Sequence, residues 1–400
     1  IRIVAPGTAQ VQRTPGRRSA ARAAAVRLAL GPERMLLTAR AAADLHAEPL
    51  EYLQDVPQQV VAFTWHNADV RLYLNAYTSL PTAVEITRPH PYDVFWNVWG
   101  DVTTRIYYSF WMLKAGGLRY PKQWDVWRNG QPVQTWLLDK LELNPAPVPK
   151  LSVSARERKA FERRGTIDAT PLGGSARTLA PGIVMLPGAW NTTVVAQDDG
   201  IVILEAPISS GYSAAVLKAA QRRYPRLPVK AVVTTSDAWP HVGGLREYVA
   251  RGIPLYALDL NVPLIEKILT APHTMRPDDL ARTPRAPQFH VVSARTAIGS
   301  GDNRIVLYPV HGEAGERMIV AYFPRRRLLY TSDLVQPTSG GRLAFPEYLD
   351  EVAKLVAREG LRVERVFGMH TPQALPWNAV VQAIAAASAD KQPKPRRSDR

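Results

Sequence analysis

The clearest hydrophobic pattern lies in the middle of the chain. A β-branched run at 229–235 predicts a buried strand, and a polar loop that ends in His241 follows it. Gly243-Gly244 and an amphipathic segment at 245–251 then predict a helix, and 253–257 predicts the next strand. A strand–loop–helix–strand unit places its loop at the carboxyl edge of a sheet, where ligands commonly bind. We therefore expect His241 to lie at such an edge.

The same alternation of strand and helix patterns continues through the C-terminal half. The ranges with strand patterns are 182–186, 192–196, 201–205, 304–309, 318–323, 328–330 and 362–367. The ranges with helical patterns are 213–224, 348–359 and 377–387. This half is therefore predicted to be a mixed α+β domain with several polar residues placed at strand ends.

The N-terminal half has a different pattern. A helix is predicted at 33–46, and strands are predicted at 69–77, 94–99, 103–113, 124–127 and 132–143. Asn129-Gly130 is a hairpin signal between two of these strands. Seven of the ten Trp residues lie between Trp65 and Trp136. We expect an antiparallel β-rich domain whose aromatic face is either the core of a curved sheet or a groove for a sugar, lipid or peptide.

Composition sets the domain boundaries. Residues 1–30 are rich in Arg, Ala and Gly and are predicted to be a disordered arm. The β-rich domain covers 31–144, a Pro-rich linker and a helix occupy 145–178, and the second domain covers 179–390. A basic tail, 391–400, is predicted to be disordered.

Charge and cysteine content exclude several classes of site and partner. The 400-residue chain has no Cys, which excludes disulfides, thiolate metal sites and Cys nucleophiles. Its net charge of +15 is scattered and accompanies no nucleic-acid motif, so we expect no nucleic-acid partner. No apolar run is long enough for a transmembrane segment. Because the chain begins at Ile1 and lacks Cys, we expect an exported bacterial protein, periplasmic or secreted, with a cytoplasmic location as the alternative.

The loop around His241 resembles the metal-binding loop of the metallo-β-lactamase superfamily, whose pattern is His-x-His-x-Asp-His-x-Gly-Gly. The four ligand positions become Ser236, Ala238, Pro240 and His241, so that His241 alone keeps ligand chemistry. The resemblance covers about residues 179–387 and implies an αββα sandwich. The predicted fold class is therefore α+β, a metallo-β-lactamase-like sandwich with an N-terminal antiparallel β-rich domain.

Three later residues match the family pattern by their place after strands. They are His311, Asp333 and His370. The resemblance implies that His241, Asp333 and His370 hold one divalent ion such as zinc, with His311 as a fourth ligand or a group that polarises the substrate. Asp237, one position out of register, is a substitute carboxylate ligand. The alternative is that His241 caps the following helix and that the other residues make ordinary pocket or backbone contacts.

Two functions are compatible with a site that keeps only some of the family's metal ligands. The first is a metal-dependent hydrolase with an atypical mononuclear site, in which His241, Asp333 and His311 act with metal-bound hydroxide on an ester, amide or phosphoester. The second is a metal-free, non-catalytic binding protein that uses the sandwich pocket and the Trp-rich domain. The expected partners are a small-molecule substrate or a cell-envelope component, and the β-rich domain is a candidate surface for a homodimer.

Overall fold

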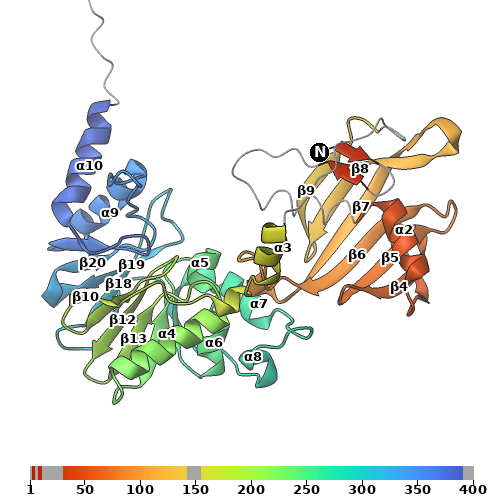
Figure 1. Cartoon of the computed structure of the whole chain (residues 1–400). Helices are drawn as coiled ribbons and strands as arrows, with labels where there is room; N and C mark the ends of the chain where they lie inside the picture. The colour runs from red at the N-terminus through yellow and green to blue at the C-terminus, as the bar shows by residue number, and fades with distance from the viewer. Residues whose placement is uncertain (1, 5–7, 11–29, 142–154, 391–400) are drawn as a thin grey trace, which may run out of the picture. The chain divides into compact units, whose positions relative to one another are not determined.

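The computed structural model describes residues 2–4, 8–10, 30–141 and 155–390 (Figure 1). They form two compact units. The first unit contains the β-rich part, and the second contains the C-terminal half together with the segment Pro91–Gly100. Most of the predicted arm, the Pro-rich linker and the basic tail lie outside the described residues. Within the arm, β1 (Arg2–Val4) and β2 (Thr8–Gln10) pair as antiparallel strands.

The first unit is a seven-stranded antiparallel sheet in which every strand pairs with the next one along the chain, as predicted. Its strands are β3 (His46–Leu53), β4 (Val56–Trp65), β5 (Ala68–Asn75), β6 (Pro81–Pro89), β7 (Asp101–Leu113), β8 (Arg119–Arg128) and β9 (Gln131–Leu137). Helix α2 (Pro32–Ala41) contributes Met35 and Ala39 to the core of one sheet face, which also includes Trp124. The Trp-rich stretch is therefore partly core.

The Asn129-Gly130 hairpin is confirmed. Asn129 has φ 45° and Gly130 has φ 76°, and together they join β8 directly to β9. Two successive residues with positive φ are what a tight type I′ hairpin turn requires, and Asn followed by Gly is the pair that adopts this conformation most readily. The sequence therefore specified this turn through local backbone preference alone.

Two predicted elements of this half differ from the structure, one in its end and one in its type. The helix predicted at 33–46 ends at Ala41, and His46 begins a strand instead. The strand predicted at 94–99 is a turn that leads into the short 3₁₀ helix η1 (Asn97–Trp99). The Asp93 carboxylate accepts hydrogen bonds from the backbone N–H groups of Phe95 and Trp96, which curls the chain where the apolar residues suggested extension.

The second unit has four layers, helices–sheet–sheet–helices, as the resemblance implied (Figure 1). The first sheet contains β10 (Arg177–Ala180), β11 (Ile183–Leu186), β12 (Thr192–Gln197), β13 (Gly200–Leu204), β14 (Val229–Val233), β15 (Leu255–Leu258) and β16 (Phe289–Val292) in that order. The second contains β17 (Thr296–Ile298), β18 (Ile305–Pro309), β19 (Ile319–Phe323), β20 (Leu328–Tyr330), β21 (Arg365–Phe367) and β22 (Leu375–Pro376). The α+β fold class is confirmed.

The helices cover the two outer faces of this sandwich. The first sheet packs against α4 (Ser210–Arg223), α6 (Leu245–Ala250), α7 (Val262–Thr270) and α8 (Asp279–Arg282). The second packs against α9 (Pro346–Arg358) and α10 (Trp377–Asp390). The short helix α5 (Trp239–Val242) lies in the loop after β14, and the helix α3 (Ala155–Glu162) belongs to the first unit. Among the helices of the described ranges, none combines the length and the apolar composition that crossing a bilayer requires.

In each sheet, one parallel strand pair positions the candidate site. Strands β13 and β14 run parallel in the first sheet, and β20 and β21 run parallel in the second. The segments that follow these four strands carry Glu205, His241, Asp333 and His370 respectively. Because parallel strands end at the same edge of their sheet, four separate segments are brought together at one edge of the sandwich.

Candidate functional site

A buried carboxylate–imidazole pair forms the floor of the site. Glu205 directly follows β13, and His241 lies in α5; both side chains are fully buried. Nδ1 of His241 lies 2.9 Å from Oε2 of Glu205. The Tyr330 hydroxyl donates a hydrogen bond to the other Glu205 oxygen at 2.8 Å, and the Thr235 hydroxyl donates to it as well. The carboxylate is thus satisfied on both oxygens, as burial of a charge requires.

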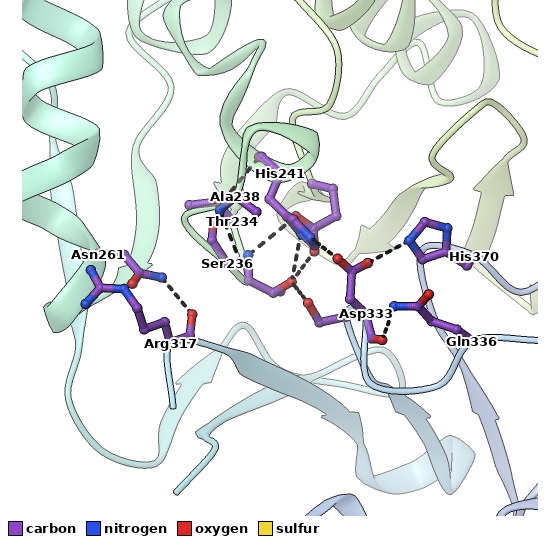
Figure 2. Close-up of polar contacts among 12 residues, drawn as sticks. Thr234, Ser236, Ala238, His241, Asn261, Arg317, Asp333, Gln336 and His370 are labelled. Atoms are coloured by element: carbon purple, nitrogen blue, oxygen red, sulfur yellow. Dashed lines mark hydrogen bonds and ion pairs between the residues drawn. The ribbon is translucent and has the colours of Figure 1, made fainter. Parts of the chain in front are cut away.

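The chain of polar contacts continues from His241 toward solvent. Nε2 of His241 lies 2.9 Å from Oδ2 of Asp333, and Nε2 of His370 lies 3.0 Å from Oδ1 of the same carboxylate. Figure 2 shows His241, Asp333 and His370 in this succession, with Gln336 donating to the backbone carbonyl of Asp333. The exposed fraction rises from zero at Glu205 and His241 to 30% at His370. The site is therefore a carboxylate–imidazole–carboxylate–imidazole chain that reaches the surface at His370.

The two carboxylates control the protonation of His241. Burial by itself lowers the pKa of His241, but the negative charges and hydrogen bonds of Glu205 and Asp333 outweigh burial and raise that pKa to about 10. Burial likewise favours a higher pKa for Asp333, but the contacts with His241 and His370 outweigh it and hold the pKa of that carboxyl well below its usual range. His241 is consequently an imidazolium whose two N–H groups donate to two carboxylates at neutral pH.

The backbone beside the carboxylate–imidazole contacts is strained at two positions. Glu205 has φ 77° and Ser332, the residue before Asp333, has φ 54°. Residues other than Gly in this region cost about 1–3 kcal/mol each and persist where the surroundings fix them. Here the fixing contact crosses between the sheets, because the Ser332 hydroxyl lies 2.7 Å from the Thr235 hydroxyl. Glu205 and Asp333, at and after these positions, both contact His241.

The three positions that departed from the ligand pattern now shape the loop. The Ser236 hydroxyl accepts a hydrogen bond from the Ala238 backbone N–H at 3.3 Å, and the Thr234 hydroxyl donates to the Ser236 carbonyl at 2.9 Å. Pro240 lies in the first turn of α5, where a missing N–H and a fixed φ are tolerated. These side chains close a turn and start a short helix, and Pro240 and Ala238 offer no donor atom to a ligand.

Two of the predicted site residues lie outside the chain of contacts. His311 is exposed, and in the part of the chain that the structure describes its side chain makes no hydrogen bond or ion pair. Asp237 forms an ion pair with Arg317, whose Nε lies 2.5 Å from the carboxylate. Arg317 also donates to the Leu260 carbonyl at 2.5 Å. Figure 2 shows Arg317, together with Asn261, apart from His241 and Asp333.

The chain of contacts does not fit the predicted one-ion site. A catalytic zinc or similar ion takes three or four N or O donors from the protein. Both ring nitrogens of His241 face carboxylate oxygens at 2.9 Å, so neither is open to a further ligand in this arrangement. Oδ1 of Asp333 is buried without an aligned hydrogen bond, so it and Nε2 of His370 are the donors that remain. Within the described ranges, no group of three or more His, Cys, Asp or Glu side chains is arranged to hold a metal ion.

A cavity of about 340 Å³ is lined in part by the loop that carries His241. Its walls belong to the second unit: the segment Pro91–Gly100 supplies Phe95, Trp96 and Trp99, and the His241 loop supplies Trp239. Leu264 and Ile268 of α7 complete the apolar lining. The Trp239 ring makes edge-to-face contacts with Phe95 and Trp190 at centroid distances of 4.8 and 4.5 Å. The loop that carries His241 thus also forms an aromatic cavity.

Two parts of this arrangement were not predicted. Glu205 lies at the end of the predicted strand 201–205 but was not predicted as the partner of His241, although an acidic residue between a strand and a helix was a signal for that role. The aromatic cavity was also missed, because Trp96 and Trp99 were assigned to a strand of the β-rich domain. The Asp93-x-Phe95 turn signal in that segment was the available hint that it leaves the sheet.

Comparison with known proteins gives structural resemblance only. No protein-family model matches the sequence, and no curated protein matches it. Among solved structures, a metallo-beta-lactamase from Pontibacter korlensis is 14% identical with a TM-score of 0.42, over 55% of this chain and 99% of that one. A metallo-beta-lactamase from Erythrobacter litoralis is 15% identical with a TM-score of 0.41, over 54% of this chain and 96% of that one. The stereoselective inverting sec-alkylsulfatase Pisa1 from Pseudomonas sp. is 16% identical with a TM-score of 0.40, over 53% of this chain and 40% of that one.

Proposed function

We propose that this chain is a metal-independent binding protein that holds a small, uncharged apolar molecule in the aromatic cavity beside the His241 loop. The observation that carries this proposal is the double engagement of His241, whose two ring nitrogens lie 2.9 Å from Glu205 and 2.9 Å from Asp333. An imidazolium held in this way is neither a metal ligand nor a general base. Its role is to tie together the two sheets and to fix the loop that forms the cavity wall.

The cavity indicates the class of ligand. About 340 Å³ lies at the lower end of the range for small-molecule sites, and aromatic and aliphatic side chains predominate in its lining. The one charged side chain among its described lining residues is Asp237, and Arg317 neutralises it. Trp239 and Phe95 present ring edges and faces that suit an aromatic guest. A compact neutral molecule with a ring therefore matches the cavity better than a charged substrate or a peptide.

The binding can be measured with N-phenyl-1-naphthylamine, a neutral fluorescent probe of suitable size. Leu264→Trp fills the cavity, and Leu260→Trp is the matched control because Leu260 is 46% exposed and is not a lining residue. We expect the probe to bind the wild-type protein and the control with equal affinity and to lose at least about tenfold in affinity for Leu264→Trp, through steric exclusion. Equal binding to both variants would show that the cavity is not the site.

The metal-dependent hydrolase of the sequence analysis is the competing function. It requires one divalent ion at His241, Asp333 and His370, acting on an ester, amide or phosphoester. Elemental analysis of tag-free protein, beside a His241→Ala/His370→Ala double variant, separates the two proposals. Negligible metal in both proteins after incubation with zinc supports the binding protein. About one ion per chain in the wild type, lost in the double variant, would support the hydrolase.

A further inference from the structure

A second cavity, of about 540 Å³, lies at the opposite end of the second sheet. Its lining includes Arg295, Arg327, Arg362, Tyr308 and Tyr322. Arg327 directly precedes β20 and Arg362 precedes β21, whereas Asp333 and His370 follow these strands. The second cavity is therefore separate from the candidate site and its loop.

The charges around this cavity are unbalanced. Arg327 forms an ion pair with Glu364, and Glu359, the acidic residue of the lining, pairs with Arg358. Among the described residues, Arg295 and Arg362 have no carboxylate within ion-pair distance. Three guanidinium groups that face one cavity repel one another, and an anion bound between them removes that repulsion.

The backbone that carries Arg327 and Arg362 is held in place. The Tyr322 hydroxyl donates a hydrogen bond to the Arg362 carbonyl at 2.7 Å. The Arg327 carbonyl accepts from the Glu364 backbone N–H at 2.8 Å, and Arg327 itself adopts a left-handed conformation with φ 47°. These contacts lock the turn before β20 to the segment before β21. Because the attachment points are fixed, less ordering entropy opposes binding than on a mobile surface.

We propose that this cavity binds a phosphoryl group. The planar guanidinium donates paired N–H groups that match two oxygens of a phosphate, and such charge-assisted hydrogen bonds are stronger than neutral ones. Arg295 and Arg362 supply the uncompensated charges, and Arg327 lies beside them. The Tyr308 and Tyr322 rings form an apolar wall that suits the organic part of a phosphomonoester.

The test uses the full chain and three probes at constant ionic strength: inorganic phosphate, phenyl phosphate, and phosphatidic acid vesicles with phosphatidylcholine vesicles as the neutral reference. Calorimetry measures the soluble probes, and cosedimentation measures the vesicles. The cavity variant is Arg295→Gln/Arg362→Gln. The control is Arg222→Gln/Arg226→Gln, which removes the same charge from two exposed arginines at and beyond the end of α4.

We expect phenyl phosphate to bind the wild type and the control equally and to bind the cavity variant roughly tenfold or more weakly, through the loss of charge-assisted contacts. Binding of phosphatidic acid without binding of the soluble probes would assign the phosphoryl group to a lipid headgroup. An equal decrease in both variants would show non-specific attraction to a cationic chain, and absence of binding by any probe would overturn the proposal. Neither result bears on the aromatic cavity, since different residues line it.

Discussion

Nε2 of His241 lies 2.9 Å from Oδ2 of Asp333, although 92 residues separate them in the sequence. The contact joins the helix α5, which follows β14 of the first sheet, to the loop that follows β20 of the second. With Glu205 on the other ring nitrogen, it makes a buried ion pair chain across the sandwich. Several measurable consequences depend on this one imidazolium.

Removal of the imidazolium should destabilise the second unit. His241→Ala leaves the Glu205 and Asp333 carboxylates in the interior without their shared counter-charge, and loss of one partner from a buried ion pair costs about 3–5 kcal/mol. Denaturant unfolding measures the change. His311→Ala is the matched control, because this exposed side chain makes no described contact and its loss should change stability by less than about 0.5 kcal/mol. Equal stability of the two variants would contradict the ion-pair chain.

The ion pairs of His241 also predict a dependence of stability on pH. The pKa of His241 rises from 6.5 in the unfolded chain to about 10 in the folded protein. Its contribution is therefore fully present below pH 6.5 and is lost as the pH rises through 10. We expect the difference in unfolding free energy between wild type and His241→Ala to shrink between neutral pH and pH 10. The difference between wild type and His311→Ala should stay constant over that interval.

Asp333 sets the lower limit of the pH range in which these ion pairs stabilise the protein. Its folded pKa is lowered from 3.8, so its contribution is present above the unfolded value and is lost as the pH falls through the lower folded value. Asp333→Asn should therefore cost stability at neutral pH and cost progressively less in acid. A constant cost of Asp333→Asn from neutral to strongly acidic pH would mean that the carboxylate charge is not what stabilises the site.

Gly244 should tolerate no side chain. A Cβ at this position would contact the Ser213 hydroxyl and approach the Ser209 carbonyl oxygen to 2.6 Å, because the loop after α5 packs directly on α4. Overpacking of this kind costs typically about 1–3 kcal/mol, so Gly244→Ala should lower the thermal midpoint. Gly165→Ala is the control, because its Cβ would meet only Ala169 Cβ at 3.4 Å. A midpoint equal to that of the control would show that the loop can move away from α4.

The Asp237–Arg317 pair should set the charge preference of the aromatic cavity. Both side chains are partly exposed, at 20% and 45%, so Arg317→Ala should change stability by less than about 1 kcal/mol. The Arg317→Ala substitution nevertheless leaves the Asp237 carboxylate unpaired in the cavity wall. We expect weaker binding of N-phenyl-1-naphthylamine and stronger binding of a cationic analogue, measured by fluorescence titration. Arg282→Ala, which breaks an exposed ion pair on α8, should change neither affinity.

The sequence by itself determined the local elements of this protein. Runs of β-branched residues such as 229–235 specified buried strands, Asn129-Gly130 specified a hairpin, and Gly243-Gly244 with the amphipathic segment after it indicated a helix. These features depend on backbone preference and on the period of the hydrophobic pattern, which a few neighbouring residues determine. The succession of strand-end residues also indicated which side chains could meet at one edge.

Only the tertiary structure decided which of those side chains meet. His311 and His370 both follow strands, yet His370 joins Asp333 whereas His311 is exposed. The two carboxylate partners of His241 were equally hidden, because Glu205 and Asp333 reach it from segments 36 and 92 residues away. Contacts of this kind depend on the packing of two sheets and on strained residues such as Ser332, and no local pattern encodes them.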